Sequence, residues 1–214
     1  MRCTLSSMVS PRRIDMSKLY RWICLLILIA MIQPACADSG QESPTTPWYL
    51  GLGIGESILG LNKSNIASAF SAATTASSYN HDDFAFHIFG GYFLDPLLAV
   101  EFGYAELGNV IATTNGTSSR LFNIYSLYVD TLLNHRYNRN AAIYAKVGAH
   151  FWDIGTRSGS SITNGTDLML GAGIELNIYG GNNRVVRVEW VRYQFDRVYL
   201  DSSDTLALNL VFKY

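Results

Sequence analysis

The fold of this chain is decided by the stretch from Phe89 to Gly108, which reads FGGYFLDPLLAVEFGYAELG. In its second half, large apolar residues alternate with small or charged ones: Leu98, Val100, Phe102 and Tyr104. Such a period of two is typical of a strand whose two faces meet different surroundings. The middle of the stretch, residues 93–96, contains an Asp-Pro pair that favours a turn. We therefore predict two antiparallel strands over residues 83–92 and 97–107.

The same alternation recurs along the chain. Segments of 9 to 13 residues with this pattern occur at 48–56, 83–92, 97–107, 121–133, 141–152, 168–178, 184–195 and 204–214. A tilted membrane-spanning strand needs about 9 to 11 residues, with alternate side chains facing lipid. The predicted fold class is all-β: an eight-stranded antiparallel up-and-down transmembrane β-barrel over residues 48–214.

The apolar faces of these segments are predicted to face lipid. They comprise Trp48/Leu50/Leu52/Ile54, Phe84/Phe86/Ile88, Leu98/Val100/Phe102/Tyr104, Leu127/Val129, Ile143/Val147/Phe151, Leu170/Ala172/Ile174/Leu176 and Leu206/Leu208/Leu210/Phe212. A soluble β-sandwich is the alternative, but its inner face would be apolar and its charges would meet water. Here the other face is small or ionisable, and aromatic residues gather near strand ends, as in the aromatic girdles of membrane barrels.

The connections between the predicted strands alternate in length. We expect long, polar loops at 57–82, 108–120, 153–167 and 196–203, and shorter turns at 93–96, 134–140 and 179–183. In outer-membrane barrels the short turns are periplasmic and the longer loops extracellular. The first strand is therefore expected to start on the periplasmic side.

The first 37 residues predict a secretory signal peptide. Basic residues up to Arg21 precede the apolar run 22–32, which is too short to span a membrane, and Ala35-Cys36-Ala37 offers a small-x-small cleavage site. Met16 is an alternative start, and acylation of Cys36 is an alternative to cleavage. We expect export by the Sec route to the bacterial outer membrane, with residues 38–47 as a short periplasmic lead.

The cysteines and the charge narrow the function classes. All three cysteines precede residue 38, so the mature chain is expected to have neither a disulfide nor thiol chemistry. Five of the 16 Lys and Arg and one of the 17 Asp and Glu also precede residue 38, which leaves 11 bases against 16 acids. That balance lacks the basic face that nucleic-acid binding requires.

Several of these segments resemble a known family. The quoted stretch 89–108 is the most specific, and it is joined by WYLG at 48–51, IYAKVGAHFW at 143–152, GAGIEL at 171–176 and RVEW at 187–190. Together they resemble the OmpA-type transmembrane domain, among the small outer-membrane β-barrels, over about residues 48–214. Because the sequence ends on its last strand, the cell-wall anchoring of the larger members is not expected.

The closing segment LALNLVFKY resembles the C-terminal signal read by the barrel-assembly machinery of the outer membrane. Its alternate apolar positions and terminal aromatic residue carry that resemblance: Leu208, Leu210, Phe212 and Tyr214. The resemblance therefore implies the assembly machinery as a partner, together with outer-membrane lipids and lipopolysaccharide.

Six ionisable residues fall on the inward face at similar heights along their predicted strands: Glu101, Asp130, Lys146, Glu175, Arg187 and Glu189. The interior of an eight-stranded barrel is only wide enough to be filled by side chains, so these charges must pair with one another or with water. They predict an ion-pair network that closes the lumen and fixes the strand register.

The alternative hypothesis for the same six residues is a gate that controls ion passage through the lumen. In the resembled family a lumenal salt-bridge switch accompanies a small ion conductance, and Glu101 and Arg187 match positions that carry it. A third member of that switch is a base, whereas this chain has Asp130 nearby, which counts against conduction.

Catalysis is not expected, and neither are a cofactor or a catalytic metal. His87 and His150 are predicted to point inward without a surrounding catalytic motif, and the trio His81-Asp82-Asp83 is read as solvated loop charge. The sequence favours a structural envelope protein with surface loops. An adhesin or host-interaction protein, binding host surface ligands, and a narrow gated pore are the alternatives.

Overall fold

The computed structural model describes residues 47–61, 78–80, 82–114, 117–138, 140–155, 161–178, 183–197 and 200–214. The predicted signal peptide and most of the predicted lead lie outside these ranges. The described part contains eight long strands: β1 (Trp48–Leu61), β3 (Asp82–Phe93), β4 (Leu98–Thr114), β5 (Thr117–Arg136), β6 (Ala141–Gly155), β7 (Ser161–Asn177), β8 (Arg184–Arg197) and β9 (Leu200–Lys213). A short strand, β2 (Ser78–Asn80), pairs with β4.

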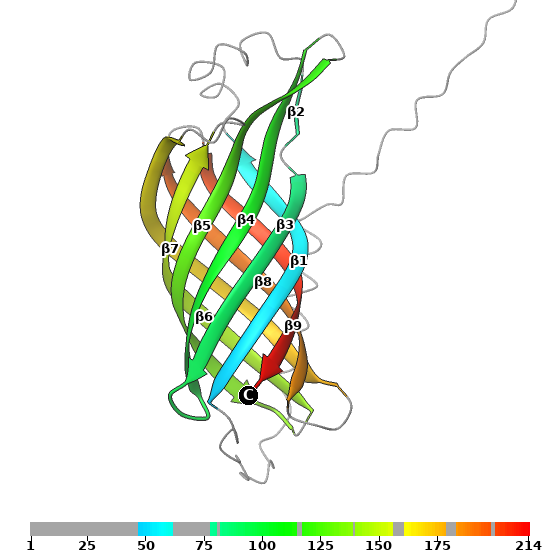
Figure 1. The fold of residues 1–214 in the computed structure, drawn as a ribbon, viewed down its shortest axis with the longest axis vertical. Coiled ribbons are helices and arrows are strands. Elements are labelled where there is room, and N and C mark those ends of the chain that lie inside the picture. Colours follow the sequence, from blue (N-terminus) through cyan, green and yellow to red (C-terminus); the bar gives the residue numbers. More distant parts are fainter. Residues whose placement is uncertain are drawn as a thin grey trace, which may run out of the picture. The chain divides into compact units, whose positions relative to one another are not determined.

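The eight long strands close into a barrel. Consecutive long strands pair antiparallel, and β1 pairs with both β3 and β9, so the sheet closes on itself. Tyr214 N donates to the Trp48 carbonyl at 2.9 Å, which brings the end of the chain beside the start of β1 (Figure 1). The predicted eight-stranded antiparallel barrel is confirmed.

No helix among the described residues is long and apolar enough to cross a membrane.

The predicted faces are also confirmed. Phe102 is 63% exposed on the outside of the barrel, and Trp48, Leu127 and Leu208 are likewise exposed. The residues between them on the same strands are buried inside. Polar and ionisable side chains, together with aromatic and aliphatic ones, therefore line the interior of the section whose outside is apolar, as expected for a barrel surrounded by lipid.

Inward glycines stand directly opposite large inward residues on the neighbouring strand. Gly51 pairs with Phe89 and Gly103 with Tyr128, and a Cβ at either glycine would overlap the opposing ring. The same relation holds for three further cross-strand pairs: Gly91–Tyr49, Gly165–Trp152 and Gly173–Tyr144. Gly148 and Gly171 stand opposite the charged residues Asp130 and Lys146. Each glycine leaves room for the side chain from the neighbouring strand, and in this way side chains fill the narrow interior of an eight-stranded barrel.

The two ends of the barrel are named here by the strand connections that lie at each. At one, the turn end, β3 meets β4, β5 meets β6, β7 meets β8, and β9 ends. At the other, the hairpin end, β4 meets β5, β6 meets β7, and β8 meets β9. Asp95 orders the β3–β4 turn, because its Oδ1 accepts from the backbone N–H groups of Leu97 and Leu98 at 2.7 and 2.9 Å.

The predicted loops at the hairpin end are wrong in extent. Most of 108–120 belongs to β4 and β5, and β8 and β9 cover 196–197 and 200–203. These polar stretches carry inward apolar residues at wider spacing, such as Val110, Ala112 and Leu200, which are at most 2% exposed. Because these side chains are buried inside the barrel, the strands extend through stretches whose polar sequence had indicated loops.

Candidate functional site

The structure brings the six inward ionisable residues together inside the barrel. Glu101 of β4 faces Asp130 of β5, and Glu175 of β7 faces Arg187 of β8. Lys146 of β6 and Glu189 of β8 complete the group. All six are less than 5% exposed. We refer to them, with Lys213 described below, as the lumenal network.

Arg187 is the centre of one half of the lumenal network. Its Nη2 lies 2.7 Å from Glu175 Oε1, its Nη1 donates to Glu101 Oε1, and its Nε donates to Glu175 at 3.2 Å. Charge-assisted hydrogen bonds of this kind are the strong ones in proteins. The guanidinium is thereby shared between a carboxylate of β4 and one of β7, two strands that do not pair with each other.

Three aromatic rings also surround this guanidinium. The Arg187 Cζ lies 4.7 Å from the ring centre of Tyr144, 5.1 Å from that of Phe89 and 5.6 Å from that of Tyr49. Cation–π contacts of this length favour the cation where it is. Because rings and carboxylates both surround it, the Arg187 side chain has little space in which to change partners.

Lys146 is the centre of the other half. Its Nζ lies 3.0 Å from Glu189 Oε2, 3.6 Å from Asp130 Oδ2 and 4.0 Å from Glu101 Oε2. Tyr144 donates its hydroxyl to Glu189 Oε2 at 2.7 Å, so an aromatic residue also ties the two halves together.

Sequence reasoning missed one charged member. Lys213 Nζ lies 3.1 Å from Glu175 Oε2 and 5.3 Å from the ring centre of Phe93. The signal was available, because the outward assignment of Phe212 places its neighbour Lys213 inside. With Lys213 the lumenal network has three bases and four carboxylates, and the aromatic side chains around it could not be assigned from alternation alone.

The residues of the predicted assembly signal lie on the outside of the closing strand. Leu208, Leu210 and Phe212 pair with Ile54, Leu52 and Leu50 of β1, and Tyr214 is exposed. They therefore form part of the apolar surface at the point where the barrel closes. Recognition of this segment by the barrel-assembly machinery stays a prediction.

A serine–histidine pair also lies in the lumen. Ser126 Oγ is 3.2 Å from His150 Nδ1, and His150 Nε2 is 2.7 Å from the Gln194 carbonyl. Ser126, His87 and His150 are each 1% or less exposed, and the predicted inward orientation of His87 and His150 is confirmed. The His150 ring packs edge-on against the rings of Tyr193 and Phe195, so the pair is enclosed among lumenal side chains.

Among the residues that the structure describes, no group of three His, Cys, Asp or Glu side chains could hold a metal ion. His81 of the trio 81–83 lies outside the described residues. The Asp83 carboxylate accepts from the backbone and side-chain nitrogens of Asn109 at 2.7 and 2.8 Å, and so ties β3 to β4.

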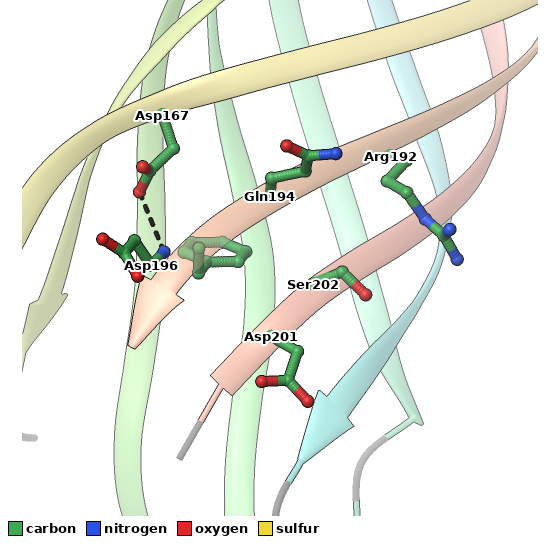
Figure 2. Close-up of a pocket in the computed structure, with 7 residues that line it drawn as sticks. Asp167, Arg192, Gln194, Asp196, Asp201 and Ser202 are labelled. Carbon is green, nitrogen blue, oxygen red and sulfur yellow. Dashed lines mark hydrogen bonds between the residues drawn. The ribbon is translucent and has the colours of Figure 1, made fainter. Parts of the chain in front are cut away.

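A polar hollow of about 340 Å³ lies at the hairpin end of β7, β8 and β9 (Figure 2). It is lined by Asp167, Arg192, Gln194, Phe195, Asp196, Asp201 and Ser202. Asp167 accepts from Trp152 Nε1 at 2.7 Å and from the Asp196 backbone at 3.2 Å. Arg192 pairs with Asp204 at 2.7 Å, so its charge is already balanced.

Comparisons with known proteins agree with this architecture. A model of the outer membrane protein β-barrel domain matches residues 23–214. The Neisserial surface protein A (NspA) is similar in structure, with a TM-score of 0.52 and 14% identity over 78% of this chain and 97% of that one. The outer membrane protein OprG from Pseudomonas aeruginosa has a TM-score of 0.51 and 8% identity over 81% and 98%. No curated protein matches the sequence.

Proposed function

Since this chain belongs to the outer membrane protein β-barrel domain family, we propose that it serves the outer membrane as a structural envelope protein that displays its hairpin end on the cell surface. The chain is a transmembrane barrel of the bacterial outer membrane, and lipids contact its apolar outside. The proposal concerns what the barrel does there.

One observation carries this proposal: the outside of the barrel is built for lipid while the inside is filled. Paired charges, aromatic rings and glycine–aromatic exchanges occupy the lumen of the described strands. A filled interior stabilises a wall but leaves little room for a solute. Function is therefore assigned to the wall and to the surface at the hairpin end.

Loss of the protein tests the structural role. A strain that lacks it should become more sensitive to detergents and bulky antibiotics, and the wild-type chain should restore resistance. A variant with four exposed hairpin-end carboxylates neutralised, Glu56→Gln, Asp82→Asn, Asp196→Asn and Asp201→Asn, should restore it equally. Unchanged sensitivity of the deletion strain would contradict the structural role.

An adhesin is the second candidate, favoured by the strands that continue at the hairpin end and by the acidic residues exposed there, such as Glu56, Asp82 and Asp201. A surface of this charge would suit a cationic host ligand through electrostatic complementarity. Cells that carry the four-residue variant would then lose attachment to host cells while keeping their detergent resistance. Lipopolysaccharide and the assembly machinery remain proposed partners of either candidate.

A narrow gated pore is the third candidate, and the surroundings of Arg187 count against it. A salt-bridge switch requires the guanidinium to leave one carboxylate for another, whereas three rings and two carboxylates surround it. We also propose no catalytic role, because the serine–histidine pair is enclosed. Planar-bilayer recordings of folded protein test the pore, and stable silence would remove it.

A further inference from the structure

The polarity of the two barrel faces inverts along several strands, and β6 shows the change clearly. Near its middle, Val147 and Phe151 are exposed outside while Lys146 is buried inside. Two residues further on, the outward residue is Asp153 and the inward residue is Ile154, which is fully buried. The strand therefore passes from a section suited to lipid into a section built like a water-soluble barrel.

Other strands change in the same way. The first outward residue beyond the apolar band is acidic on β1, β3, β4, β6 and β9: Glu56, Asp82, Glu106, Asp153 and Asp204. Acidic side chains at this position mark where the strands leave the hydrocarbon, because a charge within it is costly. The strands continue beyond this level, for example from Glu56 to Leu61 in β1.

Inside the barrel, this upper section holds an apolar layer. We define the apolar lid by seven inward side chains that are 2% or less exposed: Leu59, Leu107, Val110, Phe122, Ile124, Ile154 and Leu200. They come from β1, β4, β5, β6 and β9, and all seven belong to the buried apolar cluster that extends through the barrel interior. Val110 pairs with Phe122, and Ile124 pairs with Ile154, across neighbouring strands.

The section below the lid contains the lumenal network and further polar groups. Buried polar atoms of Tyr128, Tyr193, Thr205 and Asn209 have no hydrogen-bond partner among the described protein atoms, and beside the lid the Oδ1 atoms of Asn109 and Asn123 also lack one. Groups of this kind are normally satisfied by internal water. If the ion pairs were removed, an ion could exchange hydrating water for the remaining polar groups of this section. At the apolar lid it would have to lose its hydration without replacement, which is expensive.

We propose that the apolar lid, and not the lumenal network, is the permeability barrier of this barrel. Disruption of the ion pairs leaves the lid closed, because the lid is held by packing on other residues and at another height. Hydrophobic constrictions close pores by excluding water even where the backbone leaves space. The inference goes beyond the proposed function, since a structural barrel could act in the envelope with or without such a barrier.

Planar-bilayer recordings of two variants test this assignment. The network variant is Glu101→Gln with Arg187→Gln, and the lid variant is Leu107→Ser with Phe122→Ser and Ile154→Ser on three neighbouring strands. We expect the wild type and the network variant to stay silent and the lid variant to gain ion conductance. Leu132→Ser is the matched control, because Leu132 is an equally buried lumenal leucine outside the lid, and it should remain silent.

Each protein is first shown to be folded by its different electrophoretic mobility before and after boiling in detergent. Conductance in the network variant with the lid intact would overturn the proposal, and so would silence of a folded lid variant. If the lid variant does not fold, the network variant alone tests the proposal. A silent network variant supports the lid as the barrier, and a conducting network variant refutes the proposal.

Discussion

Arg187 Nη2 lies 2.7 Å from Glu175 Oε1, and the two residues face each other across the ladder between β7 and β8. Arg187→Met should be strongly destabilising, because Glu101 and Glu175 would lose a hydrogen-bonded partner while staying buried. Loss of one member of a buried pair costs about 3–5 kcal/mol. The change is measured as a shift of the urea unfolding midpoint in detergent. Arg184→Met, an exposed position on the same strand, is the control and should shift the midpoint little.

Lys213 is predicted to matter less than Arg187. Lys213→Met removes the 3.1 Å contact with Glu175, but Arg187 still holds that carboxylate. We therefore expect a loss at the lower end of the range for a hydrogen bond to a charged group, about 1.5–3 kcal/mol. A double-mutant cycle between Lys213→Met and Glu175→Gln measures the coupling. Strict additivity of the two changes would show that this contact contributes nothing.

The inward glycines give a steric prediction. Gly103→Val should destabilise the barrel by about 1–3 kcal/mol, because its side chain would overlap the ring of Tyr128, and overpacked cores lose stability in this range. Gly90→Val is the control, since a Cβ at Gly90 meets its nearest atom only at 3.7 Å. Thermal unfolding followed by gel mobility compares the two. Equal tolerance of both changes would contradict the exchange of small for large side chains.

The apolar band gives a prediction about lipid. Phe102 is the second most exposed of the large apolar residues on the outside, after Tyr214. Phe102→Arg should destabilise the folded barrel by about 2–4 kcal/mol if the position lies near the middle of the bilayer. Asn164→Arg, an exposed position towards the hairpin end, should cost much less. Refolding into vesicles at several urea concentrations measures both, and equal costs would contradict the placement of the band.

The strands and their faces were predictable because a single physical rule governs them. A strand in lipid must alternate, so Phe102 and Leu127 indicated outward positions and Glu101 and Lys146 inward ones. Lys213 obeys the same rule and was missed only because its neighbours were read as an assembly signal. The positions of Tyr49, Phe89 and Tyr144 around Arg187 depend on cross-strand register, which alternation along one strand does not specify.

The hairpin end could not be predicted by that rule, because its polarity inverts and a bulge interrupts the spacing. Register shifts occur between Glu106 and Asn109 in the β4–β5 ladder, so Leu107 and Val110 are both inward although three residues apart. A pattern of period two fails across such a bulge. Ser, Thr and Asn on the outside then read as loop, although the inside of the same section is apolar.

The extent of these strands leads to a prediction about hydrogen exchange. Amides along the ladder from Asn109–Asn123 to Thr113–Ser118 should exchange more slowly than those of Tyr137 and Asn138, which follow β5 at the turn end. The reason is that ladder hydrogen bonds above a close-packed apolar layer open only when the packing opens with them. Exchange of the folded protein in detergent, followed by mass spectrometry, measures the difference. If residues 109–113 exchange as fast as the turn, that segment is a loop in solution and the apolar lid has lost one of its walls.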